Sequence, residues 1–172
     1  MERTHLLTSS FQDFGLAEPI SRALKEENYH TPTPIQAQTI PLAITGRDVV
    51  GIAQSGTGKT AAFALPILHR ILENRIRPQP KTCRVLVLSP TRELSGQILD
   101  SFNAYGRHIR LSSALAIGGV PMGAQVRALD GVEQVAAAAV GPAARQGVAE
   151  GQEQAAPVPL EPVHGQRDLT TL

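Results

Sequence analysis

The sequence predicts an α/β domain built on a parallel sheet, because short apolar runs alternate with longer helical ones. The runs Asp48–Ala53, Arg84–Ser89 and Leu111–Ile117 are predicted strands. Between them, Lys59–Glu73 and Thr91–Tyr105 carry apolar residues over helical lengths. A strand, a helix and a second strand in succession are typical of βαβ units, which pair their strands in parallel.

Two further helical segments are predicted before the first strand. Phe11–Asn28 has apolar residues at helical spacing. The prolines of Thr31–Pro34 interrupt it, because proline restricts the preceding residue to extended geometry. Ile35–Ile44 resumes the helical pattern, and Gly46 is suited to end it.

Length and composition narrow the class of protein. A chain of 172 residues suits one domain, and its 42% hydrophobic and 18% charged residues exclude a wholly disordered chain. No stretch of about 18 apolar residues is present to span a membrane. Cys83 is the single cysteine, which excludes an internal disulfide. Residues 1–10 lack the apolar core of a signal peptide, so the sequence predicts a cytoplasmic protein.

The composition changes near residue 130. Residues 131–172 contain no Ile, Phe, Tyr, Lys, Met, Asn or Ser, and carry a net charge of −3 against +4 for residues 1–130. Such a segment buries too little apolar surface to offset the entropy of ordering, so residues 131–172 are predicted to form a poorly ordered, Ala/Gly/Pro-rich tail. The tail is either a natural extension or the translation of a shifted reading frame in a GC-rich gene. Within it, Val132–Val140 is a candidate for one strand, although its alanines bury little area.

A glycine-rich segment lies between the first predicted strand and the helix after it. Gly56 and Gly58 allow backbone angles that direct successive N–H groups at phosphate oxygens. The helix beginning at Lys59 adds partial positive charge, the lysine can reach the β- and γ-phosphates, and the Thr60 hydroxyl can ligate Mg²⁺. The segment therefore predicts a phosphate-binding loop, although Ala53 stands where the usual pattern has its first glycine. The predicted nucleotide-binding residues of this loop are Ala53, Gln54, Ser55, Gly56, Thr57, Gly58, Lys59 and Thr60.

Further motifs give the chain a resemblance to the DEAD-box ATP-dependent RNA helicases. Residues 28–36 read Asn-Tyr-His-Thr-Pro-Thr-Pro-Ile-Gln, similar to the Q motif of that family, and Phe11 lies seventeen residues before them. The resemblance implies that Phe11 and Tyr29 belong to the ATP site, that Tyr29 stacks on adenine and that Gln36 reads the base edge. A carboxamide suits that role because it both donates and accepts hydrogen bonds. For Tyr29 or Gln36 alone, the alternative is an ordinary surface residue.

A second motif, Pro90–Leu94 followed by Gln97, resembles motif Ia of the same family, with Ser95 in place of alanine. The resemblance implies that this helix start and Arg92 hold the sugar-phosphate backbone of RNA. Helix N-termini and guanidinium groups suit phosphates, and such contacts carry no sequence information. The Gly118–Gly119 pair resembles a glycine doublet that lets RNA approach closely, and a simple tight turn is the alternative. The predicted RNA-binding residues are Pro90, Thr91, Arg92, Glu93, Gly118 and Gly119.

The resemblance covers residues 11–130. It implies part of a RecA-like P-loop domain that binds ATP with Mg²⁺ and RNA. Gln54–Ser55 and the turn from Gly118 to Met122 are most similar to bacterial RhlE-type members. Cys83 and the scattered histidines lack metal-ligand spacing and are interpreted as structural. No motif indicates a protein partner.

Several motifs of the family have no counterpart here. The 172 residues contain no Asp-Glu-Ala-Asp, no Ser-Ala-Thr and no Thr-Pro-Gly-Arg, and the resemblance ends near Leu129, where the composition changes. That coincidence favours a truncated or frame-shifted product. Because ATP hydrolysis needs an acidic Mg²⁺ partner and stabilised transition-state charge, this chain is expected neither to hydrolyse ATP nor to unwind RNA. A non-enzymatic ATP- or RNA-binding fragment and a non-functional product stay open as alternatives, and the Q motif disfavours a nucleotide kinase.

Overall fold

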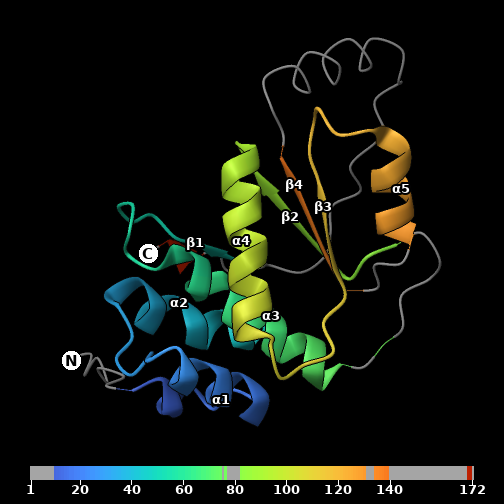
Figure 1. Ribbon diagram of the computed structural model, residues 1–172. Helices are drawn as coiled ribbons and strands as arrows, with labels where there is room; N and C mark the ends of the chain where they lie inside the picture. The colour runs from blue at the N-terminus through green and yellow to red at the C-terminus, as the bar shows by residue number, and fades with distance from the viewer. Residues whose placement is uncertain (1–9, 75, 77–81, 131–133, 140–169, 172) are drawn as a thin grey trace, which may run out of the picture. The chain divides into compact units, whose positions relative to one another are not determined.

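The computed structural model describes residues 10–74, 76, 82–130, 134–139 and 170–171 (Figure 1). Its contacts divide the chain into two compact units, which are described separately below. The first unit holds Met1–Arg77, Asp100–Leu111 and Arg167–Leu172, and the second holds Pro78–Leu99 and Ser112–Gln166. Parallel strand pairing with flanking helices confirms the predicted α/β class.

The first unit is mainly helical. Two predicted helices appear with nearly the predicted bounds: Ile35–Ile44 is observed as Pro34–Ile44, and Lys59–Glu73 is observed unchanged. Gly46, at φ 85°, follows the C-terminal end of the second helix as the sequence predicted. The elements are the 3₁₀ helix η1 (Phe11–Phe14), the helices α1 (Glu18–Glu26), α2 (Pro34–Ile44) and α3 (Lys59–Glu73), and the strands β1 (Val49–Val50) and β5 (Thr170–Thr171).

The strand before the glycine-rich loop is shorter than the sequence predicted. Asp48–Ala53 was expected to be extended throughout, but β1 covers Val49–Val50 and pairs in parallel with Thr170–Thr171. A strand extends only as far as its hydrogen-bonding partner does, and β5 supplies two residues. Val50 is 49% exposed and Ile52 is 75% exposed, so part of this apolar run is open to solvent.

The core of the first unit forms where α2 and α3 pack together and α1 packs against α3. Leu65 and Leu68 of α3 are fully buried, as are Ile20 of α1 and Ile40 of α2. His69 is also buried, and its Nδ1 accepts a hydrogen bond of 3.1 Å from the backbone N–H of Ala17. This bond fastens the segment before α1 to the helix that follows the loop.

The second unit holds a parallel sheet of three strands in the order β2-β4-β3 (Figure 1). Val85 pairs with Val135, which pairs on its other side with Ser113. The helix α5 packs beside β3, and the helix α4 begins in the second unit and ends in the first. The elements are β2 (Val85–Ser89), α4 (Arg92–Tyr105), β3 (Ser113–Ala116), α5 (Met122–Asp130) and β4 (Val135–Ala139).

The strand β4 falls inside the segment that the composition assigned to a poorly ordered tail. Val132–Val140 was the candidate strand of that segment, and Val135–Ala139 confirms it. Val135, Ala136 and Ala137 are buried, and β4 is the central strand of the three. Thr170–Thr171 form a second short strand within this segment, and the rest of the predicted tail, residues 131–133, 140–169 and 172, lies outside the described residues.

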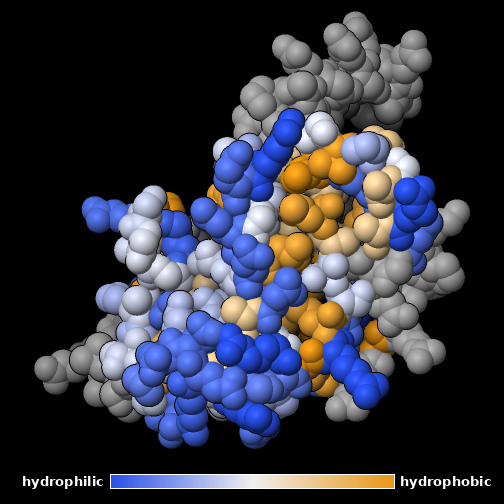
Figure 2. Space-filling model, viewed as in Figure 1, coloured by the Kyte–Doolittle hydropathy of each residue, from blue (hydrophilic) through white to orange (hydrophobic). Residues whose placement is uncertain are grey.

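Apolar side chains lie at the surface over the β2-β4-β3 sheet (Figure 2). Leu86 is 60% exposed and Leu88 is 61% exposed, and the two point to the same face because strand side chains alternate. Parallel sheets normally have both faces covered. Among the described residues, this face of β2 is left partly uncovered. No described helix has the length and apolar character needed to cross a membrane.

Candidate functional site

The glycine-rich loop between β1 and α3 has the backbone shape that the sequence predicted. Gly56 has φ 80° and Gly58 has φ 84°, both in the left-handed region that favours glycine. Gln54, Ser55 and Gly56 are exposed, so their backbone is open to a ligand. The helix α3 begins directly after Gly58, which places its partly positive N-terminus at the loop. This arrangement suits a bound phosphate.

Lys59 lies on the loop itself. Its Nζ donates to the carbonyl oxygens of Ala53 and Gln54, both at 2.6 Å. The ammonium group is therefore held beside the backbone that would surround the phosphates. To reach β- and γ-phosphate oxygens as predicted, the ammonium exchanges these carbonyl oxygens for phosphate oxygens, which carry a full negative charge and bind it more strongly.

The Q motif is joined to the loop by two side chains. The Gln36 Nε2 donates to the Gly58 carbonyl oxygen at 3.1 Å, and its Oε1 accepts from the Thr33 N–H at 2.9 Å. The Thr33 hydroxyl donates to the Thr57 carbonyl oxygen at 2.8 Å. Gln36 is 2% exposed. In this structure its amide therefore holds the loop, and its predicted reading of adenine stays a prediction.

Tyr29 belongs to a cluster of aromatic rings. Its ring meets that of Phe11 edge to face at a centroid separation of 5.9 Å, and that of Tyr105 at 5.7 Å. The two tyrosine hydroxyls are hydrogen bonded at 3.2 Å. Burial and this bond raise the pKa of Tyr105 above its ordinary value. Phe11 is buried and Tyr29 is half-buried, so Tyr29 is the more accessible of these two rings.

The residues around the loop fit a magnesium ion that arrives with a nucleotide. Thr60 follows Lys59 in the first turn of α3, and its hydroxyl is the oxygen donor that Mg²⁺ prefers. Among the residues that the structure describes, no group of three or more His, Cys, Asp or Glu side chains is placed to hold a metal. Mg²⁺ commonly keeps its waters and binds through substrate phosphates with few protein ligands, which suits this donor set.

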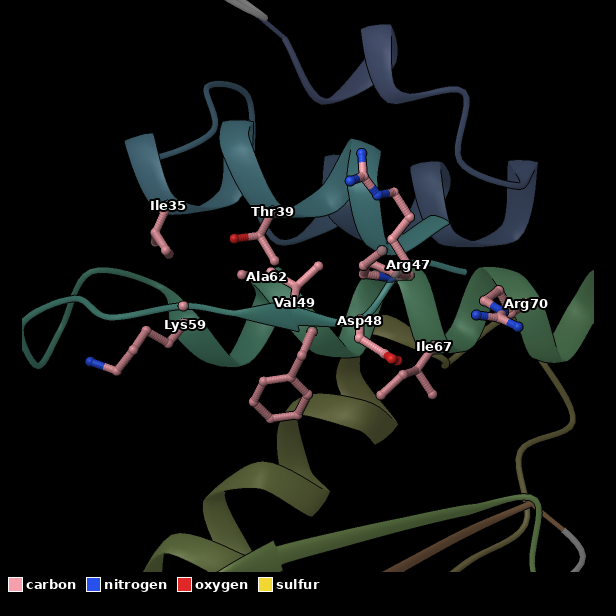
Figure 3. Close-up of a pocket in the computed structure, with 13 residues that line it drawn as sticks. Ile35, Thr39, Arg47, Asp48, Val49, Lys59, Ala62, Ile67 and Arg70 are labelled. Atoms are coloured by element: carbon pink, nitrogen blue, oxygen red, sulfur yellow. The ribbon is translucent and has the colours of Figure 1, made fainter. Parts of the chain in front are cut away.

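A groove of about 510 Å³ lies beside the loop, between α2, β1 and α3 (Figure 3). Ile35 and Thr39 point toward β1, while Lys59 and Arg70 lie at opposite ends of the row of lining residues. The Thr39 hydroxyl is buried without a partner. The loop residues 54–58 do not line the groove, so it is an apolar neighbour of the phosphate site and not the phosphate site itself. Its lining residues are Ile35, Thr39, Ala43, Arg47, Asp48, Val49, Gly51, Lys59, Ala62, Phe63, Pro66, Ile67 and Arg70.

In the second unit, the structure brings together two of the predicted RNA-binding elements. Gly119 has φ 80°, and a Cβ built on it would lie 2.7 Å from Nη1 of Arg92. A Cβ on Gly118 would lie 3.6 Å from Nη2 of the same guanidinium. Arg92 therefore lies against a turn that is open because it has no side chains. An exposed guanidinium beside exposed backbone is suited to a phosphodiester.

The start of α4 presents the rest of the predicted RNA-binding residues. The Thr91 hydroxyl accepts a hydrogen bond from the Leu94 N–H at 3.2 Å, which makes Thr91 the N-cap of this helix. Ser95 is buried, and its hydroxyl bonds to that of Ser89 at the end of β2. Ser95 thus fastens the helix start to the strand, which accounts for a serine at this position. Pro90, Thr91, Arg92 and Glu93 are all exposed.

A family model for the DEAD/DEAH box helicases matches residues 33–144, well over half of the chain. The chain belongs to the DEAD/DEAH box helicase family. The match includes the glycine-rich loop, Arg92 and the Gly118–Gly119 turn. It also continues past residue 130, where the sequence had placed the end of the resemblance, and it includes β4.

The curated helicases that the chain matches are much longer than it is. The ATP-dependent rRNA helicase RRP3 of Pyricularia oryzae is 52% identical over 122 residues, covering 71% of this chain and 22% of that protein. The Yarrowia lipolytica protein of the same name is 48% identical, covering 71% of this chain and 24% of that protein. The chain therefore spans about a quarter of these relatives.

Solved helicase structures share the fold. A hypothetical ATP-dependent RNA helicase from Sulfolobus tokodaii superposes with a TM-score of 0.63 at 31% identity, covering 80% of this chain and 37% of that one. The RNA helicase Prp28 from Chaetomium thermophilum, solved bound to ADP, superposes with a TM-score of 0.66 at 33% identity. That match covers 75% of this chain and 32% of Prp28.

Reasoning from sequence missed three residues that contact the candidate sites. Thr33 binds the loop, and the signal was present, because a threonine before Pro34 is a helix N-cap. The Tyr105 hydroxyl is hydrogen bonded to that of Tyr29. The two residues are far apart in the sequence, so no local pattern predicts this contact. Gln125 bonds to the backbone around Gly118–Gly119, on a helix that was not predicted.

Proposed function

We propose that this chain binds ATP through the loop 54–58 and α3, and binds the backbone of RNA through Arg92 and the Gly118–Gly119 turn. The observation that carries the ATP site is the glycine loop itself, with two left-handed glycines before the N-terminus of α3 and Lys59 seated on it. Mg²⁺ would enter with the phosphates, take the Thr60 hydroxyl as a ligand and neutralise phosphate charge.

RNA is the polymer we propose because the guanidinium of Arg92 lies against open backbone. The fungal relatives are named ATP-dependent rRNA helicases, which supports RNA as the ligand class. Contacts to phosphates and sugars make the binding independent of sequence. We place the protein in the cytoplasm. The curated RRP3 relatives are fungal and give no support to a bacterial RhlE-type grouping, which stays a prediction.

We infer that residues 1–172 by themselves bind both ligands without turning ATP over. They contain no Asp-Glu-Ala-Asp, and the described residues hold no acidic cluster suited to a metal. Phosphoryl transfer needs an acidic partner for Mg²⁺ and stabilised transition-state charge, and an arginine finger alone contributes on the order of 10³- to 10⁵-fold. Phosphate release stimulated by RNA at the rate of an intact helicase, and lost in Lys59→Ala, would show that the chain is catalytically complete.

The ATP site is tested by calorimetry with ATP and GTP on the wild type and on Gln36→Ala. We expect the wild type to prefer ATP, because a polar reader left unpaired by the wrong base costs about 1–3 kcal/mol. We expect Gln36→Ala to lose that preference. Equal affinities for ATP and GTP in the wild type would contradict adenine recognition while leaving phosphate binding intact. No binding of either nucleotide would contradict the ATP site as a whole.

A further inference from the structure

Gln125 has its side chain turned back onto the turn that precedes its own helix. Its Oε1 accepts a hydrogen bond of 2.8 Å from the Ile117 N–H. Its Nε2 donates to the Ile117 carbonyl oxygen at 2.9 Å and to the Val120 carbonyl oxygen at 3.0 Å. A carboxamide has one NH₂ with two hydrogens, and both are used here.

These three bonds enclose the glycine pair. Ile117 precedes Gly118 and Val120 follows Gly119, so the Gln125 amide joins the two ends of the turn. Gly118, Gly119 and Val120 are all exposed, and Gly119 has φ 80°. An exposed turn with two glycines has many accessible backbone conformations, and fixing one of them costs entropy. The bonds to Gln125 fix one conformation of the turn before a ligand binds, so binding itself does not have to order it.

Arg92 lies against the Gly118–Gly119 turn in the conformation that the Gln125 bonds hold. A Cβ on Gly119 would lie 2.7 Å from Nη1, 3.0 Å from Nη2 and 3.2 Å from Cζ of Arg92. The end of the Arg92 guanidinium therefore occupies the space that a side chain at this position would take. A turn of another shape would remove the surface that orients the guanidinium.

We propose that Gln125 is a positioning residue for RNA binding, which shapes the Gly118–Gly119 turn so that the turn and the Arg92 guanidinium face one phosphodiester together. It contacts no ligand itself and acts through the turn and Arg92. This inference rests on the proposed RNA site. Preorganisation of this kind raises affinity by lowering the cost of ordering on binding.

A role in the core does not account for Gln125. None of the side chains of α5 is buried, and Gln125 is itself partly exposed. Met122 is 75% exposed and Val126 is 47% exposed on the same helix. We therefore expect the loss of the Gln125 bonds to change the turn much more than the stability of the chain.

The test measures binding of a fluorescent single-stranded oligouridylate to the full chain across a range of salt concentrations. Gln125→Met keeps the length of the side chain and removes its hydrogen bonds, and Gln38→Met makes the same change at an exposed position of α2. Arg92→Gln removes the proposed phosphate contact. Calorimetry with ATP and denaturant unfolding on the same variants report on the other site and on folding.

We expect Gln125→Met to weaken RNA binding about tenfold with an unchanged salt dependence, because it removes order and no charge. Arg92→Gln should weaken binding and lower the slope of log affinity against log salt by about 0.7, the value for one phosphate of a single strand. The double variant should bind about as weakly as Arg92→Gln alone, because Gln125 acts through Arg92. Gln38→Met should match the wild type, and ATP affinity should be unchanged throughout.

Two results separate the failure of this inference from that of the proposed function. If Arg92→Gln weakens RNA binding and Gln125→Met does not, or if their effects simply add, the positioning role is overturned and the RNA site stands. If the wild-type chain does not bind the oligouridylate, the RNA site falls and the positioning role falls with it. A loss of ATP affinity in Gln125→Met that parallels the loss of RNA affinity would reveal general unfolding and would also overturn the role.

Discussion

In both candidate sites a glutamine side chain holds a glycine turn, but the glutamine is buried in one site and partly exposed in the other. Each offers a glycine turn, and in each a glutamine amide bonds to the backbone of that turn: Gln36 to Gly58, and Gln125 to Ile117 and Val120. Gln36 is 2% exposed on a helix with four buried residues. Gln125 is partly exposed on a helix with none.

Because of this difference in burial, we expect changes at the two turns to affect the stability of the fold to different extents. The phosphate loop is held by a residue of the core, so a change there disturbs both the stability of the first unit and its ligand. The RNA turn is held from the surface, so a change there should alter binding with little effect on stability. Substitutions at and around the two turns test this contrast, and the one with the largest expected loss of stability comes first.

Gly58→Ala should be the most damaging of the glycine substitutions. A Cβ at Gly58 would lie 2.3 Å from Nε2 of the buried Gln36, and φ is 84°. We expect a loss of about 2–4 kcal/mol in the free energy of unfolding, from backbone strain plus the broken Gln36 bond, together with loss of ATP binding. Urea unfolding and calorimetry measure the two effects.

Gly56→Ala is the matched control for that substitution. Gly56 has φ 80°, but nothing lies within 4 Å of a Cβ built there. Gly56→Ala should therefore lower the free energy of unfolding by about 1–2 kcal/mol, from the strain of a left-handed alanine alone. If both variants were equally destabilised, the contact between Gln36 and the loop would contribute nothing.

Gly119→Ala should lower the free energy of unfolding about as much as Gly56→Ala does. It should also weaken RNA binding, as Arg92→Gln does. Its Cβ would displace the guanidinium of Arg92, which is the far end of an exposed, flexible side chain. We expect a cost of about 1–2 kcal/mol, from φ alone, and weaker RNA binding in fluorescence titrations. A loss of stability as large as that of Gly58→Ala would remove the contrast between the two turns.

Ser95→Ala should have a smaller effect. It removes the bond to Ser89 at the start of α4, but the Ser89 hydroxyl keeps the Thr91 carbonyl as a partner at 3.0 Å. Because no buried polar group is orphaned, we expect a cost of about 0.5–1.5 kcal/mol in thermal or urea unfolding. RNA affinity unchanged from the wild type would mean that Thr91 and Pro90 fix the helix start without it.

The smallest effect at neutral pH concerns Tyr105. Its pKa is raised by burial and by the bond to Tyr29, whereas an unfolded chain ionises this phenol near pH 10. Above that pH the unfolded state loses a proton that the folded state keeps, so stability should fall as the pH rises through and beyond 10. Tyr105→Phe should weaken this alkaline loss in unfolding measured at several pH values. An identical alkaline loss in Tyr105→Phe would assign it to other groups.

The parts of this fold that local signals specify were predictable from sequence. The helix α3 has the predicted bounds Lys59–Glu73, because a left-handed glycine precedes it and its apolar residues recur at helical spacing. The helix Thr91–Tyr105 was predicted to begin at Thr91, and Thr91 is its N-cap. The glycine turns, Lys59 and Arg92 could be named because each belongs to a compact motif.

The parts that depend on distant partners could not be predicted. The helix α5 has small exposed residues and no buried stripe, so it carried no periodic signal. The strand β4 is rich in alanine, and its place between β2 and β3 depends on neighbours that sequence does not reveal. The contact of Arg92 with Gly119, and the bonds from Gln36 to the loop, likewise join segments that are separate in the chain.

We propose that the two glycine turns are separate ligand sites, one for ATP and one for RNA. The most direct test measures the affinities for both ligands in Lys59→Met and in Arg92→Gln. We predict that Lys59→Met loses ATP binding and keeps RNA binding, and that Arg92→Gln does the reverse. If either substitution lowers both affinities, or if neither changes the affinity for its own ligand, the claim is contradicted.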